Sequence, residues 1–100
     1  MKVDLNKELD NLKEDGGYWK SFVEKDNFEL GVLYLRPGQE DVQNPHKSDE
    51  VYFITDGDGI MTIDGVDHEI TPGSAFVVMK GTPHKIHSNT KPIVGYYALN

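Results

Sequence analysis

The sequence predicts a small all-β domain, a sandwich or jelly roll, preceded by one short helix. Apolar residues recur in eight runs of about four to eight residues, which is the length of a strand. Glycine, proline and aspartate pairs separate these runs, and such pairs form turns. The chain has 100 residues, enough for one domain with a thin core. We expect a helix and connector over residues 1–17 and a β-barrel domain over residues 18–100.

The N-terminal segment has the pattern of one short amphipathic helix. Leu5, Leu9 and Leu12 are spaced by four and then three residues, so they fall on one stripe of a helix. Asp4 is suited to cap the N-terminus, and Gly16 to end the helix. Because a helix this short is marginal alone in water, we expect it to pack against the strands.

From residue 18 onward, short apolar runs alternate with turn signals. Asp64-Gly65, between two short runs, is typical of a type I′ hairpin. Gly57, Gly73 and Gly81 stand at strand ends, where a sharp reversal favours positive φ, so we expect them to serve the fold and not the chemistry. The expected strands are YWKSFVE, NFELGVLYL, EVYFIT, GIMTID, HEI, AFVVM, HKIHS and IVGYYAL. Strands at this spacing are typical of a sandwich or jelly roll.

The composition excludes several classes of function. A net charge of -7 argues against duplex nucleic acid or an anionic membrane as a partner, since both attract clustered Lys and Arg. There is no cysteine, hence no disulfide, thiolate ligand or cysteine nucleophile. The N-terminal residues are charged and lack the apolar centre of a signal peptide, and no run is long enough to span a bilayer. We therefore expect a cytoplasmic protein.

Two segments carry metal-ligand side chains. The first, residues 38–57, is GQEDVQNPHKSDEVYFITDG and contains His46 and Glu50. The second, residues 73–88, is GSAFVVMKGTPHKIHS and contains His84. Two imidazoles and one carboxylate are the donors of a facial metal triad with open coordination positions. These segments are the strongest indication of function in the sequence.

The two segments resemble the two motifs of the cupin superfamily, whose members are small antiparallel jelly-roll barrels, also described as a double-stranded β-helix. The family motifs are G-x5-H-x-H-x3–4-E-x6-G and G-x5-P-x-G-x2-H-x3-N, and every spacing in this chain fits them. The chain departs from them at three positions, where Asn44 replaces the first His, Met79 the Pro and Ser88 the Asn. The resemblance extends from about residue 33 to the C-terminus.

The resemblance implies that His46, Glu50 and His84 line the barrel and bind one divalent metal ion, which could be Mn, Fe, Ni or Zn. Strand geometry is consistent with this site, because every second residue of a strand points to the same face. The even-numbered residues of 44–52 therefore point the same way if the strand is regular. Tyr52 is then a candidate pocket residue with a phenol that can donate a hydrogen bond or a proton. The alternative is a core aromatic residue with its hydroxyl satisfied.

Asn44 is the most informative departure from the motif. An amide oxygen is a harder and weaker ligand than imidazole, so ligation by Asn44 favours metals that prefer oxygen, such as Mn, Fe or Ni. Alternatively, water takes that coordination position, and Asn44 caps the turn before Pro45, since Asn-Pro is a common turn pair. The sequence leaves both interpretations open.

Two other histidines are weaker candidates for metal binding. His87 has the opposite strand parity to His84, so we expect it to face outward. His68 lies between Asp67 and Glu69, but alternation places it on the other face from the two acids. We expect both histidines to lie outside the metal site.

Three functions are compatible with these residues. One is a metal-dependent enzyme acting on a small molecule, for which the resemblance implies dioxygenase-like or isomerase-like chemistry. Another is a binding or sensory module without catalysis. The third is a metal-free relic, against which the intact His46, Glu50 and His84 set argues. We expect a small-molecule ligand or substrate, no nucleic-acid or membrane partner, and a homodimer that protects exposed strand edges.

Overall fold

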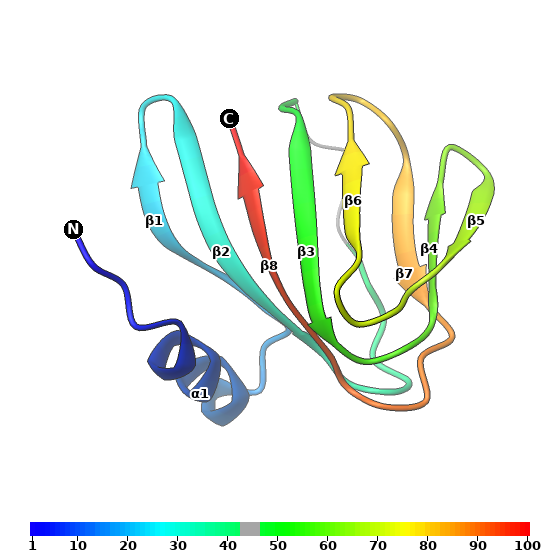
Figure 1. Cartoon of the computed structure of the whole chain (residues 1–100), viewed down its shortest axis with the longest axis horizontal. Helices are drawn as coiled ribbons and strands as arrows, with labels where there is room; N and C mark the ends of the chain where they lie inside the picture. The colour runs from blue at the N-terminus through cyan, green and yellow to red at the C-terminus, as the bar shows by residue number, and fades with distance from the viewer. Residues whose placement is uncertain (43–46) are drawn as a thin grey trace.

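The computed structural model describes residues 1–42 and 47–100, which form two antiparallel sheets and one helix (Figure 1). The strand orders are β1-β2-β8-β3-β6 and β5-β4-β7. The predicted all-β jelly roll with a short N-terminal helix is confirmed, and each expected strand is present within a residue or two. The elements are α1 (Leu5–Asp15), β1 (Trp19–Lys25), β2 (Phe28–Leu35), β3 (Glu50–Asp56), β4 (Ile60–Ile63), β5 (Val66–Glu69), β6 (Ala75–Val78), β7 (His84–His87) and β8 (Ile93–Leu99).

Helix α1 begins and ends at the residues that the sequence indicates. The Asp4 side chain accepts a hydrogen bond from a first-turn backbone N–H at 3.2 Å, and Gly16 ends the helix with φ of 79°. Leu12 is buried, and the helix packs on β2 and β1. The Arg36 guanidinium donates to carbonyls at the C-terminal end of the helix, which fastens it to the end of β2. No helix in the described part of the chain is long and apolar enough to cross a membrane.

The core lies between the two sheets. Along β3, Glu50, Tyr52 and Ile54 are buried, whereas Phe53 and Thr55 are exposed, so the strand alternates as expected. The inward residues of both sheets meet in one cluster. Its members are Tyr18, Leu33, Leu35, Tyr52, Ile54, Met61, Ile70, Phe76, Val78, Ile86, Ile93 and Tyr97.

The glycines of the two motifs have the backbone conformation that their positions predict. Gly57, Gly73 and Gly81 have φ of 111°, 85° and 75°. Gly31 on β2 serves a different purpose, because a Cβ there would lie 2.1 Å from the Tyr97 ring. The absence of a side chain at this position lets that ring lie flat across the sheet.

The first motif is not one continuous strand. The expectation that the even-numbered residues of 44–52 share a face required a regular strand. Strand β3 begins at Glu50, and residues 47 and 48 just before it form a bend, so within the described part of 44–52 shared parity holds only from Glu50 to Tyr52. The Asp49 carboxylate accepts from the Lys80 N–H at 2.9 Å, and the Asp49 N–H donates to the Asn100 side chain at 3.0 Å. These bonds fix the start of β3. Asn44 and His46 lie outside the described residues.

Candidate metal centre

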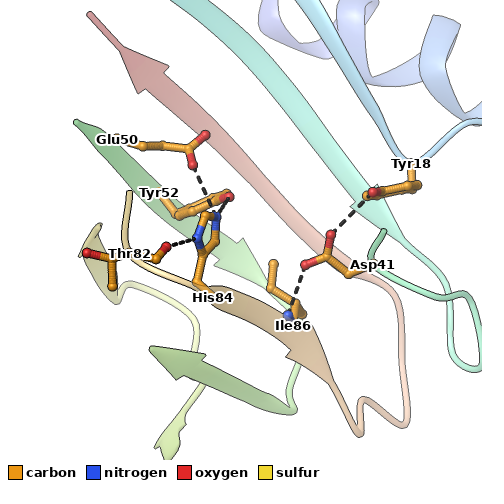
Figure 2. A network of polar contacts seen from close by, with 7 residues as sticks. All are labelled: Tyr18, Asp41, Glu50, Tyr52, Thr82, His84 and Ile86. Atoms are coloured by element: carbon orange, nitrogen blue, oxygen red, sulfur yellow. Dashed lines mark hydrogen bonds and ion pairs between the residues drawn. The ribbon is translucent and has the colours of Figure 1, made fainter. Parts of the chain in front are cut away.

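Glu50, Tyr52 and His84 meet inside the barrel (Figure 2). Glu50 and Tyr52 share the inner face of β3, and His84 begins β7 in the other sheet. Their exposed fractions are 3%, 1% and 9%. His84 Nε2 lies 3.5 Å from Glu50 Oε1 and 3.1 Å from Tyr52 Oη. The carboxylate of the first motif and the imidazole of the second are therefore neighbours in a buried site.

The orientation of the His84 ring determines which nitrogen faces this site. His84 Nδ1 lies 3.0 Å from the Thr82 carbonyl oxygen, which can only accept, so Nδ1 carries the hydrogen. In the neutral ring, Nε2 then presents a lone pair, which is the form that binds metals. That lone pair faces a carboxylate oxygen, which is also an acceptor. A proton on Nε2 or a metal ion placed between the two atoms would be stabilised by both of them.

The pKa shifts of His84 and Tyr52 also favour a cation at His84 Nε2. When the ring is protonated, Nε2–H can donate a hydrogen bond to Glu50, and this raises the pKa of His84 above its ordinary value, although burial opposes that shift. Burial raises the pKa of the Tyr52 phenol far above its usual range, and the nearby Glu50 carboxylate adds to the rise. Tyr52 therefore remains a neutral hydrogen-bond donor, whereas His84 attracts a proton or another cation at Nε2.

The donor pair fits a divalent metal. Two atoms bound to one ion at about 2.1 Å lie about 3.0 to 3.4 Å apart, for octahedral to tetrahedral angles. The 3.5 Å between Glu50 Oε1 and His84 Nε2 is close to that range. Within residues 1–42 and 47–100, no group of three His, Cys, Asp or Glu side chains is placed to hold a metal ion. A complete site needs a further ligand such as His46, which together with Asn44 lies outside those ranges.

Asp41 is a second buried carboxylate, and the sequence analysis missed it. Its Oδ1 accepts from the Tyr18 hydroxyl at 3.2 Å, and its Oδ2 accepts from the Ile86 N–H at 2.9 Å (Figure 2). The Tyr18 hydroxyl in turn accepts from the Val42 N–H at 3.0 Å. Asp41 thus ties the segment before residues 43–46 to β7. Nothing in the local pattern distinguishes it from its exposed neighbour Glu40, so a single sequence carries no signal for this role.

Tyr18→Phe is expected to lower the free energy of unfolding by about 1 to 3 kcal/mol. Asp41 would lose a donor, and the Val42 N–H would lose its acceptor. Urea denaturation measures the change, with Tyr34→Phe as the matched control. Tyr34 is half-buried, and its ring lies beneath Lys13 and Arg36. Equal losses in the two variants would contradict a specific role for the Tyr18 hydroxyl.

His68 and His87 lie apart from the three buried residues. His87 Nε2 contacts the Thr62 hydroxyl at 2.8 Å, and its Nδ1 contacts the Ser88 hydroxyl at 2.8 Å. The ring of His68 packs edge-on against Phe76, with 6.4 Å between centroids. Both are placed away from the site, as alternation predicts. His87 is half-buried by these contacts, although a solvated position is what parity alone suggests.

Comparison with known proteins identifies the family. A family model described as a cupin domain matches residues 31–96. The chain belongs to the cupin family. One cupin relative is an uncharacterized protein of Streptomyces coelicolor, 34% identical over 80 residues that cover 80% of this chain and 75% of that protein. Another is the dimethylsulfoniopropionate lyase DddW of Ruegeria pomeroyi, 38% identical over 55 residues that cover 55% of this chain and 36% of the lyase.

Solved structures share the cupin fold of this chain. The crystal structure of protein NMB1881 from Neisseria meningitidis superposes with a TM-score of 0.74 at 23% identity and covers 100% of both chains. The dimethylsulfoniopropionate lyase DddQ from Ruegeria pomeroyi superposes with a TM-score of 0.73 at 19% identity, over 87% of this chain and 49% of the lyase. At these identities the likeness concerns the fold alone.

Proposed function

We propose that this cupin binds one divalent metal ion inside the barrel and uses it to act on a small molecule. Glu50 and His84 are the ligands within the described residues. His46 is the further ligand that the sequence motif predicts, and Asn44, at the position of the motif's first His, is a candidate for another. The supporting observation is the close approach of a carboxylate and an imidazole in a buried site, with Glu50 Oε1 3.5 Å from His84 Nε2. A bound ion would supply a Lewis acid that polarises an oxygen of a carboxylate or enolate.

The chain's own residues have separate roles in this proposal. Thr82 holds Nδ1–H of His84, which keeps the Nε2 lone pair directed at the site. Tyr52 stays protonated because burial raises its pKa, so it suits the role of a hydrogen-bond or proton donor to a ligand oxygen better than that of a base. The side chains of Tyr52 and His84 are buried, which excludes water and strengthens their electrostatic effects.

The untagged protein is expected to hold close to one divalent ion per chain. Elemental analysis after reconstitution with Mn, Fe, Ni or Zn measures this, and Glu50→Gln and His84→Gln should each remove most of the metal. His68→Gln is the matched control, because His68 is exposed and lies against Phe76 outside the site. Substoichiometric metal with all four ions would contradict the proposal.

The reaction is the next question for the metal-loaded protein. Oxygen uptake with diols, diketones and phenolics tests dioxygenase-like chemistry, and product analysis of the same compounds tests isomerase-like chemistry. Lyase chemistry is a second candidate, favoured by the similarity to DddW over 55 residues. Consumption of dimethylsulfoniopropionate tests it directly. Binding of one of these compounds without turnover would favour a binding or sensory module instead.

A further inference from the structure

We propose that Asp41, held by Tyr18, is a positioning residue for the metal site and fastens the two motif segments to each other. The inference rests on the proposed metal binding, and it concerns a residue that the family motifs leave unspecified. Asp41 lies between Gly38 and Asn44, where the first motif accepts any residue. Asp41 is only 7% exposed. Because a buried carboxylate is costly unless it is bonded, its bonds indicate what it does.

Asp41 joins the first motif to the second. Its Oδ2 accepts from the Ile86 N–H at 2.9 Å, across 45 positions of sequence (Figure 2). In the described part of the chain, β7 is an edge strand of its sheet, and the Asp41 side chain bonds to its backbone at that edge. Ile86 and His84 share the buried face of β7, two residues apart. The bond therefore holds the strand from which His84 reaches the metal site.

Tyr18 holds the other oxygen of Asp41. Its hydroxyl donates to Asp41 Oδ1 at 3.2 Å and accepts from the Val42 N–H at 3.0 Å. The Tyr18 ring belongs to the core cluster, so packing fixes the position of the hydroxyl. In the sequence, Asn44 and His46 follow two and four residues after Val42. Because each residue adds only two soft dihedral angles, an anchor this close restricts where the next side chains can lie.

Asp41 also acts on the metal site through its charge. The pKa of His84 is raised first by the hydrogen bond that its protonated ring can donate to Glu50, and the Asp41 charge adds to the rise. Burial is the main cause of the raised pKa of Tyr52, and Asp41 adds to that shift as well. Asp41 is therefore near enough to influence both residues, as its place beside them in Figure 2 shows.

Metal affinity separates a positioning role from a structural one. Affinity is measured on the folded chain, so a substitution that only lowers stability leaves the Kd of the metal unchanged. A substitution that frees the ligands raises Kd, because metal binding must then order them. Residues that orient metal ligands typically contribute about 10- to 100-fold in affinity.

Competition for Mn, Fe, Ni or Zn against a chelating dye measures Kd on the untagged full chain, well below its melting temperature. Asp41→Ala should weaken binding at least about tenfold. Asp41→Asn keeps an acceptor for the Ile86 N–H, so it should lose less affinity than Asp41→Ala. Tyr18→Phe keeps the ring and the Asp41 charge but removes the anchor, so it should weaken binding at least about threefold. Circular dichroism establishes that each variant is folded, and Tyr18→Phe carries the test if Asp41→Ala does not fold.

Glu40→Ala is the matched control. Glu40 adjoins Asp41 and carries the same charge, and its carboxylate lies 3.6 Å from the Lys85 ammonium on β7. It therefore links the same two segments, but the Lys85 and Glu40 side chains are 52% and 70% exposed. Ion pairs so exposed contribute little, so Glu40→Ala should leave Kd within about threefold of the wild type.

The possible outcomes distinguish this inference from the proposed function. Wild-type affinity in folded Asp41→Ala or in Tyr18→Phe would overturn the inference and leave Asp41 a structural residue, while the proposed metal binding would stand. Equal losses in Glu40→Ala and Asp41→Ala would assign the effect to charge near β7 and overturn it as well. A wild type that binds none of the four ions would overturn the proposed function itself, and this inference with it.

Discussion

Gly57→Ala is expected to destabilise the fold by about 3 kcal/mol or more. Gly57 has φ of 111°, a conformation that residues with a Cβ rarely adopt. An added Cβ would also lie 2.7 Å from Ile93 Cα and 2.8 Å from the Pro92 carbonyl oxygen. Both are backbone atoms, so no side-chain rotation relieves the contact. At about 4 to 8 °C per kcal/mol for a domain of this size, the melting temperature should fall by more than ten degrees.

Gly65→Ala separates the two causes of that loss. Gly65 has φ of 78°, but nothing lies within 4 Å of the position that its Cβ would take. Its substitution should cost only the backbone strain, about 1 to 2 kcal/mol. Thermal unfolding followed by circular dichroism compares the two variants. Equal losses would show that the contact with the start of β8 contributes nothing at Gly57.

Much of the fold could be predicted because its signals are local. Asp4 and Gly16 cap the helix with their own atoms and backbone, and Asp64-Gly65 forms a turn between paired strands. Alternation along β3 follows from strand geometry alone. Such features depend on a few consecutive residues, so one sequence contains all the information that they need.

The face to which each apolar residue points was harder to predict. Trp19 and Phe28 belong to the expected strands, yet their side chains are 47% and 41% exposed. Met79, which replaces the Pro of the second motif, is 56% exposed. In β6, both faces carry apolar residues, so hydrophobicity cannot distinguish the core side from the outer face. Only the pairing with β3, which is distant in the sequence, decides it.

The site was predicted in part. The motif spacing indicated that Glu50 and His84 act together, and the two residues are neighbours in the buried site. Strand parity placed Tyr52 beside Glu50 correctly. That argument required a regular strand, so it does not extend to residues 47–49, which precede β3. Asp41 was missed because its partners come from β7 and from the segment before β1, and no local pattern reports such distant contacts.

Saturating divalent metal is expected to raise the melting temperature by roughly ten degrees or more. Glu50 and His84 lie on strands of different sheets, so a metal that joins them binds only the folded chain. At a hundredfold excess over Kd, the stabilisation is RT ln(1 + [L]/Kd), about 2.7 kcal/mol. The apo protein should still fold, because the apolar cluster between the sheets is independent of the metal. Thermal scans with and without Mn, Fe, Ni or Zn measure the difference.

Glu50→Gln should abolish most of this metal-dependent rise. The substitution keeps the volume and one acceptor oxygen, replaces the other oxygen with an amide donor and removes the charge, so the apo protein should melt near the wild-type temperature or slightly above it. His68→Gln, outside the site, should leave the rise intact. If apo Glu50→Gln melts far below apo wild type, Glu50 supports the barrel through its hydrogen bonds, and its assignment as a metal ligand loses its basis.

The pH dependence of the same scans separates a ligand from a structural residue. Because Glu50 raises the pKa of His84, the folded apo protein binds that proton more tightly than the unfolded chain does. The resulting stabilisation is fully present below the unfolded pKa of about 6.5 and is lost as the pH rises through the folded pKa. Metal competes with this proton for Nε2, so the metal-dependent rise should grow over the same interval. In Glu50→Gln both trends should flatten, because the carboxylate that holds the proton and the metal is gone.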